Sequence, residues 1–495
     1  MMNVSWAFRG FLGLLLMGEL LASPVYSQQP KAPLPAAESG LTLDQYLDQV
    51  RGGSQPFQGA SALDQAGDLR QVQGDLAGWP VIMGSMTNFD NHTPSTSSFA
   101  PLGTKGETRQ IGLQWTSPIG LGASYTQNIT HNTLTIAPAA AGFYPLTDYY
   151  QSSTVLEVNQ PLWRNFLGAE SRAQRDVLES SALAMHYGGR YQKKMILADA
   201  EMTYWRLALN QELVRIQTAA LERSNTLVDY NERRGRLNLA DRSDLLQAQA
   251  LNKQSQMDLQ RALDGEKSAA AAFNMARGLA GDQVAETLTP PPLEFLLTQA
   301  PPPRADMRDD VRAAEQNRRL ASANAQMGLE RAKPDVVLFA NSTHSGLAAT
   351  ESAASSQVSQ GTYPSSTVGV RMTFMLGPGL TDVWSSYRAE QDSAEAQWRQ
   401  KMLEQERDWT ELNRQLTETR ARLKLAVEVE AIQREKLDYE RERMKRGRST
   451  TSQVILFESD FARAQQSRIQ TQIELISILA RLKTWAEDTS SSETP

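Results

Sequence analysis

The 495-residue sequence has no cysteine and only four histidines, which are spread along the chain. The absence of cysteine excludes disulfide bonds, thiolate metal sites and cysteine nucleophiles, and the histidines leave little material for a metal site. The net charge of −6 argues against a nucleic-acid-binding protein. The mean hydropathy is −0.45, and no segment has the roughly 18 consecutive apolar residues of a membrane-spanning helix, so a helical transporter is disfavoured.

Motifs of common enzymes are also missing. The sequence contains no glycine-rich phosphate loop, no Gly-x-Ser-x-Gly nucleophile turn and no His-Glu-x-x-His zinc helix. We therefore expect a protein that is not an enzyme and that has no cofactor, no metal site and no nucleic-acid partner.

The N-terminus has the features of a secretory signal peptide over residues 1–27. Arg9 supplies the positive charge, residues 11–17 form a short apolar core, and small residues precede a cleavage point after Ser27. Residues 28–40 are rich in proline and alanine and predict a mobile leader. The mature protein is expected to be exported without a helical membrane anchor.

Two long stretches without proline, 162–289 and 379–494, are rich in strong helix formers. A single helix over 169–236 would be about 100 Å long, far beyond the usual length in globular proteins. Helices of this length need partner helices, as in a coiled coil. A narrow apolar stripe in the second stretch supports this prediction and consists of Trp409, Leu412, Leu416, Leu423 and Val427.

Alternating polar and apolar residues predict strands in two regions, 81–162 and 335–376. In the first region the alternation marks more segments than two. The sequence leaves open which of these segments cross a membrane: 81–89, 108–117, 121–130 or 151–160.

The chain also contains an internal repeat, because a shift of 209 residues places Asp229 on Asp438 and Arg234 on Arg443. The predicted first repeat, 41–286, comprises a helix near its start, strands 81–162 and a helical hairpin 169–280. A proline-rich extended connector, 287–304, leads to the second repeat. That repeat, 305–487, comprises helix 305–333, strands 335–376 and helical hairpin 380–487, and a disordered tail 488–495 follows.

The turn of each predicted hairpin is crowded with charged residues. Cations favour the C-terminal end of a helix and keep an exposed tip soluble, so these residues do not by themselves prove a binding role. The compatible alternative is that both tips dock against another protein. The candidate docking residues are Arg234, Asn238, Leu239, Asp241, Ser243 and Asp244 in the first turn, and Arg443, Gly447, Arg448, Ser449 and Thr450 in the second.

Four local patterns resemble those of the TolC-like outer-membrane efflux proteins. They are QPLWR (160–164) with Gly168, NLADRSDLLQA (238–248), RDDVRAAE (308–315) before Lys333-Pro334-Asp335, and Gly377-Pro378-Gly379. Each pattern is weak alone, but their order within a repeat is fairly specific. The resemblance covers nearly all of 41–487.

The resemblance implies a mostly α protein with a β-barrel. Three copies would each give four strands to a 12-stranded outer-membrane barrel, and helical hairpins would continue it as a long periplasmic α-helical barrel. Pro161, Gly168, Gly377 and Pro378 would form the strand-to-helix corners. The family often has acidic residues at a constriction near the tip, whereas the matching positions here are Gln453 and Leu456. Acidic residues stand instead at Asp241 and Asp244 in the first hairpin turn. In the second hairpin they stand at Glu458 and Asp460, about one helical turn beyond the matching positions.

The resemblance further implies the outer membrane of a Gram-negative cell as the location. It implies that the chain forms a homotrimer in contact with outer-membrane lipid. The other implied partners are a periplasmic adaptor protein and an inner-membrane pump of the RND, ABC or MFS type. The favoured function is a passive exit duct for small toxic molecules, and type I protein secretion is an alternative that the sequence does not separate. A periplasmic adaptor is less favoured, because it would have a single hairpin and an N-terminal anchor.

Overall fold

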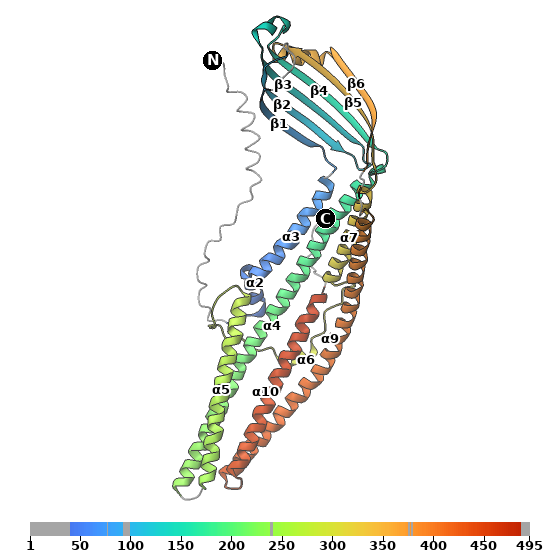
Figure 1. The fold of residues 1–495 in the computed structure, drawn as a ribbon. Helices are drawn as coiled ribbons and strands as arrows, with labels where there is room; N and C mark the ends of the chain where they lie inside the picture. The colour runs from blue at the N-terminus through green and yellow to red at the C-terminus, as the bar shows by residue number, and fades with distance from the viewer. Residues whose placement is uncertain are drawn as a thin grey trace.

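The computed structural model is elongated, with a β-sheet at one end and two helical hairpins at the other (Figure 1). The described residues are 40–76, 78–92, 100–237, 241–374, 377 and 380–486. The expected signal peptide, the leader up to residue 39, Asn238, Leu239, Pro378 and the tail therefore lie outside the described residues. Among the described helices, none combines the length and apolar composition needed to cross a membrane.

Two very long helices run nearly the whole length of the helical part. They are α4 (Ala169–Arg236) and α9 (Leu380–Lys445). Each turns back into a shorter helix, α5 (Arg242–Ala276) and α10 (Thr451–Leu482) respectively. The remaining helices are α2 (Leu43–Gly53), α3 (Gln55–Leu76), α6 (Leu293–Thr298), α7 (Asp309–Arg331) and α8 (Glu351–Ser359), with 3-10 turns at Pro138–Phe143, Phe166–Gly168 and Lys483–Trp485.

Neither α3 nor α6 was expected from the sequence. Helix α3 contains several glycines, which lower helix propensity, but it packs along α4 through the buried face of Ala60, Gly67 and Gly74. The connector 287–304 was expected to be extended, yet it contains α6, because Leu296 is drawn into the core between the hairpins. In both places tertiary packing overrides the local preference.

The hydrophobic core lies mostly among the helices. One cluster joins α4, α6, α9 and α10, and it includes the stripe residues Leu412, Leu416 and Leu423. A second cluster joins α2, α4 and α5 around Tyr46 and Phe273, whose rings stack 4.2 Å apart. A third cluster lies close to the tips. Each hairpin thus buries its apolar stripe against its neighbours within one chain.

The sheet is an antiparallel meander in which each strand pairs with the next along the chain. Its strands are β1 (Val81–Asn91), β2 (Gly103–Thr116), β3 (Gly122–Thr135), β4 (Asp148–Pro161), β5 (Asp335–Ala348) and β6 (Tyr363–Thr373). The resemblance implied four strands in each chain, and the sheet has six. The difference arises because all four candidate segments of the first repeat join the same sheet. Strands β1 and β6 are the two edges.

Candidate functional site at the tips and corners

The two helical turns lie side by side at the end of the molecule remote from the sheet (Figure 1). Hydrogen bonds join the hairpins there. The Thr451 hydroxyl donates to Asn231 Oδ1 at 2.9 Å, and the Tyr230 hydroxyl donates to the Met444 carbonyl at 3.1 Å. A shared apolar cluster includes Leu227, Ala248, Leu437, Met444, Val454 and Phe461. The tips therefore form one packed unit.

The second turn is tied together by its own polar groups. Gly447 has a φ of +71°, the left-handed conformation that ends α9. Thr450 is the N-cap of α10, and its hydroxyl accepts the backbone N–H of Gln453 at 3.4 Å. Arg443 donates to the buried carboxylate of Glu440 and to the Arg448 carbonyl, both at 3.2 Å, so it holds the turn in shape.

The first turn is described only in part. Asp241 is the N-cap residue of α5, without a side-chain capping hydrogen bond, and Ser243 is exposed. The Arg234 guanidinium lies over the Tyr230 ring, 5.6 Å from its centroid. In the second turn, Arg446 and Arg448 are exposed. These two are the more direct candidates for contact with a partner.

The candidate constriction residues lie one turn into the returning helices. Gln453 and Leu456 are both exposed and three residues apart on α10, and Asp244 is half-buried in the first turn of α5. Glu458 is different, because it is buried and pairs with Arg223 at 3.2 Å and with Arg441. Its charge is therefore used to join α4, α9 and α10.

The corner between β4 and α4 is tightly built. Pro161 ends β4, and Gly168, with a φ of +77°, is the N-cap of α4. A Cβ at Gly168 would lie 1.9 Å from the Pro118 carbonyl, so the β2–β3 turn sits directly on this corner. Asn165 and Leu167 also have positive φ, a conformation that costs about 1–3 kcal/mol at such residues. At the second corner, Gly377 is exposed with open space around it.

An ion-pair network joins this first corner to the second half of the chain. Glu170 accepts from Arg164 at 2.9 Å and from Arg331 of α7 at 2.7 Å. Burial favours the neutral acid, but these hydrogen bonds hold the pKa of Glu170 below its usual value. The carboxylate thus stays charged and fastens α7 to the start of α4.

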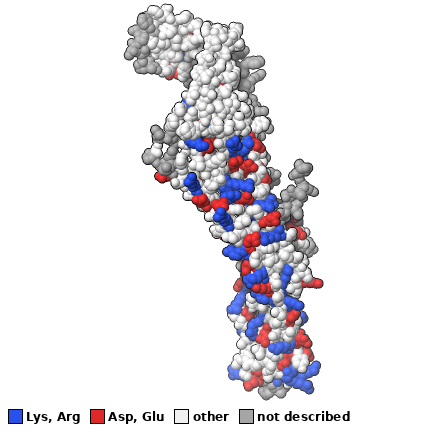
Figure 2. Space-filling view, turned by 90° about the vertical axis from the view of Figure 1, so that its right-hand side faces the viewer, with Lys and Arg blue, Asp and Glu red and all other residues white. Residues whose placement is uncertain are grey.

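The sheet differs from the helices in its charge. On the face shown in Figure 2, lysine, arginine, aspartate and glutamate crowd the helical part and are scarce over the sheet. Exposed aromatic side chains gather where the sheet meets the helices, namely Trp79, Trp115, Trp163, Phe166 and Trp384. A sheet surface with few charges, bordered by aromatic residues, is typical of a membrane-facing surface.

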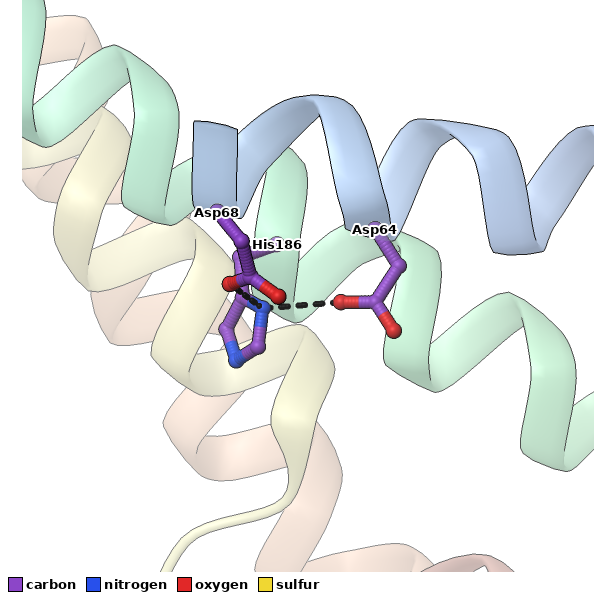
Figure 3. A group of neighbouring side chains, drawn as sticks. All are labelled: Asp64, Asp68 and His186. Atoms are coloured by element: carbon purple, nitrogen blue, oxygen red, sulfur yellow. Dashed lines mark ion pairs between the residues drawn. The ribbon is translucent and has the colours of Figure 1, made fainter. Parts of the chain in front are cut away.

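A cluster of possible metal ligands, which the sequence analysis did not single out, lies between α3 and α4 (Figure 3). His186 Nδ1 is 2.7 Å from a carboxylate oxygen of Asp64 and 2.7 Å from one of Asp68. Lys193 donates to the other oxygen of Asp64 and supplies a positive charge. The two helices are very close here, since a Cβ at Gly67 would lie 2.6 Å from the backbone nitrogen of His186. We therefore assign this cluster to helix packing.

Comparison with known proteins gives a match in fold alone. No family model matches the sequence, and no curated protein does so. Three similar solved structures are outer-membrane proteins, two of which are described as channels. VceC of Vibrio cholerae has 16% identity and a TM-score of 0.62, and the match covers 90% of this chain and 95% of that one.

The other two structures are similar over comparable lengths. CmeC of Campylobacter jejuni has 12% identity and a TM-score of 0.61, with 94% of this chain and 95% of that chain covered. The open state of MtrE of Neisseria gonorrhoeae has 12% identity and a TM-score of 0.61, with 92% and 96% covered. The fold is therefore that of the outer-membrane efflux channels, as the sequence motifs predicted.

Proposed function

We propose that this protein is the outer-membrane exit duct of a tripartite efflux system in a Gram-negative cell. The fold match along almost the whole chain carries the proposal. The structure supports it with a sheet that shows few charges at one end and a long helical extension at the other (Figures 1 and 2). The duct is passive and conducts small toxic molecules, which an inner-membrane pump and a periplasmic adaptor deliver to it.

The proposed assembly is a homotrimer. An exposed stripe on α9 supports it, because Leu425, Val429, Ile432 and Tyr439 follow one another at spacings that place them on one helix face. The unpaired edges of the sheet at β1 and β6 also require partners in lipid, where backbone groups without hydrogen bonds are costly. Two hairpins, rather than one, distinguish the chain from a periplasmic adaptor.

The proposed adaptor-docking surface consists of the two tips and includes the exposed cations Arg446 and Arg448. Arg443 is a poor choice for testing docking, because its reversal would also break the contact with Glu440. The double variant Arg446→Glu/Arg448→Glu avoids this problem. Arg388→Glu, at an exposed position of α9 near the sheet, is the matched control.

The experiment measures two properties of the same variants. Purified wild-type protein should be a trimer that conducts ions across planar bilayers, and all variants should do the same. In cells that depend on this duct, the double tip variant should lose resistance to pumped toxic compounds, whereas Arg388→Glu should retain it. A monomer without conductance would contradict the duct. Normal resistance in the tip variant would contradict docking at these residues.

A further inference from the structure

The strands of the sheet fall into two groups by their connections. Four strands are each followed or preceded in the chain by a helix of the helical part, which we call the tunnel helices. These pairs are β1 with α3, β4 with α4, β5 with α7 and β6 with α9. Strands β2 and β3 are joined only to other strands, so they form an additional hairpin within the sheet. Four strands would suffice to connect the helices, and the function of the additional pair has to be found in the sheet itself.

The register shows that, in the part of the sheet next to the helices, one face is apolar across both groups of strands. Residues directly opposite each other in antiparallel strands lie on the same face. One row across β2 to β6 contains Trp115, Ala123, Val158, Ala340 and Val368. The neighbouring row across β1 to β4 contains Ile82, Leu113, Tyr125 and Leu156. Every strand thus contributes apolar side chains to one continuous band.

The opposite face is polar along the matching rows. One such row across β2 to β6 contains Gln114, Ser124, Glu157, Asn341 and Thr367. This alternation, apolar on one face and polar on the other, is the pattern of a membrane barrel with a water-filled interior. In these rows, strands β2 and β3 follow the same alternation as β4 and β5.

Nothing within the described chain covers this apolar band. Ile82 is 77% exposed, Ile111 67% and Val368 73%. Helix α8 packs on this same face, against Gly346 of β5, which lies three rows further from the tunnel helices than Ala340. Such a large apolar surface needs an apolar environment, and the scarcity of charge over the sheet in Figure 2 fits lipid acyl chains.

The turn of the additional hairpin, between β2 and β3, lies at the same level as the end of the neighbouring strand β4. Its turn is closed by the Ser117 N–H, which donates to the Leu121 carbonyl at 2.8 Å. The turn rests on the first corner, where a Cβ at Gly120 would lie 2.7 Å from the Asn165 carbonyl. The hairpin therefore ends at the level where β4 meets α4.

We propose that all six strands of each chain cross the outer membrane. This inference rests on the proposed trimeric duct: three copies of six strands would close a barrel of eighteen. Barrel diameter grows roughly in proportion to strand number, so the opening would be about half as wide again as that of a twelve-stranded barrel. In the closed barrel, β6 of one protomer pairs with β1 of the next.

The test uses single cysteines, because the natural sequence has none to interfere. Leu113→Cys and Gln114→Cys probe the two faces of β2. Leu156→Cys and Glu157→Cys lie in the same two rows on β4, which serves as the matched reference. Each variant is labelled in outer-membrane vesicles with a membrane-impermeant maleimide, after its trimer has been verified on a gel.

On β4, the Glu157→Cys variant should react readily with the maleimide. The Leu156→Cys variant should be labelled at least about tenfold more slowly, because its thiol faces lipid. The same alternation is expected for Gln114→Cys and Leu113→Cys on β2. Equal labelling of the two β2 variants, with alternation preserved on β4, would overturn the six-strand barrel and leave the duct standing. Loss of alternation on β4 would overturn the duct and the barrel together.

Discussion

The two ends of the molecule are stabilised in different ways. At the helical end, apolar side chains of four or more helices meet within one chain, and Leu423, Leu475 and Leu482 are fully buried. At the sheet end, both faces of β1 and β6 are almost entirely exposed, and of the described strand residues only Val336 is a buried hydrophobic side chain. The helical end carries its own core, whereas the sheet depends on what surrounds it.

Polar groups show the same contrast. Arg468 is buried among the helices, where it donates to Glu212 at 2.7 Å, to Glu430 and to Gln472. Burial opposes its charge, but these carboxylates outweigh that effect and raise the pKa of Arg468. The helical end thus pairs its buried charges internally. The sheet instead places mostly polar residues on one face and leaves the apolar rows of the other face exposed.

The largest expected effect comes from the helical core. Leu423→Ala should lower the free energy of unfolding by about 2–5 kcal/mol, because a fully buried leucine leaves a cavity. Leu403→Ala on the same helix is the control, since Leu403 is 73% exposed and its loss should cost no more than about 0.5 kcal/mol. Urea denaturation in detergent, followed by the helical circular dichroism signal, measures both. Similar losses in the two variants would contradict a core confined to one chain.

The sheet should respond to charge according to the face. Val370→Lys, on the apolar face of β6, should destabilise the protein in lipid bilayers by about 2–4 kcal/mol. Thr367→Lys lies on the polar face of the same strand and should cost much less. The folded fraction in vesicles, measured across a urea series, separates the two variants. If Thr367→Lys were the more damaging, the assignment of the faces would be reversed.

The smallest expected effect is at the junction of the two ends. Gly168→Ala should cost about 1–3 kcal/mol, since its φ is positive and the new methyl group would clash with the Pro118 carbonyl. Gly188→Ala has open space around it within α4 and should stabilise the helix by up to about 1 kcal/mol. Thermal unfolding of the two variants should shift in opposite directions. A neutral Gly168→Ala would show that the corner tolerates rearrangement.

Local sequence patterns were sufficient to predict the long helices and most of the strands. The proline-free stretch predicted a helix over 169–236, and α4 spans those residues. The alternation in the first repeat indicated candidate strands but left open how many would join one sheet. Helix α3 was not predicted, because its glycines lower the helix propensity of the sequence. In the structure, two of these glycines, Gly67 and Gly74, lie on the face that packs against α4.

At the candidate site, the sequence located the two turns but not the contacts within them. It grouped Arg443 with the docking cations, while the structure binds it to Glu440 and to the Arg448 carbonyl. It also placed Glu458 among acidic residues near a constriction, whereas Arg223, 235 positions earlier in the chain, holds it in the core. A cation near a helix end has the same local signature whether it is free or paired, so sequence spacing could not separate these roles.

The sequence by itself determined the lengths of the helices, the alternation of the strands and the residues that end each hairpin. These follow from backbone propensity and side-chain periodicity, which act over a few neighbouring residues. Only the tertiary structure decided that six strands join one sheet, that α3 lies against α4 and that Glu458 is buried. Those outcomes depend on contacts between residues far apart in the chain, whose energies appear only when the surfaces meet.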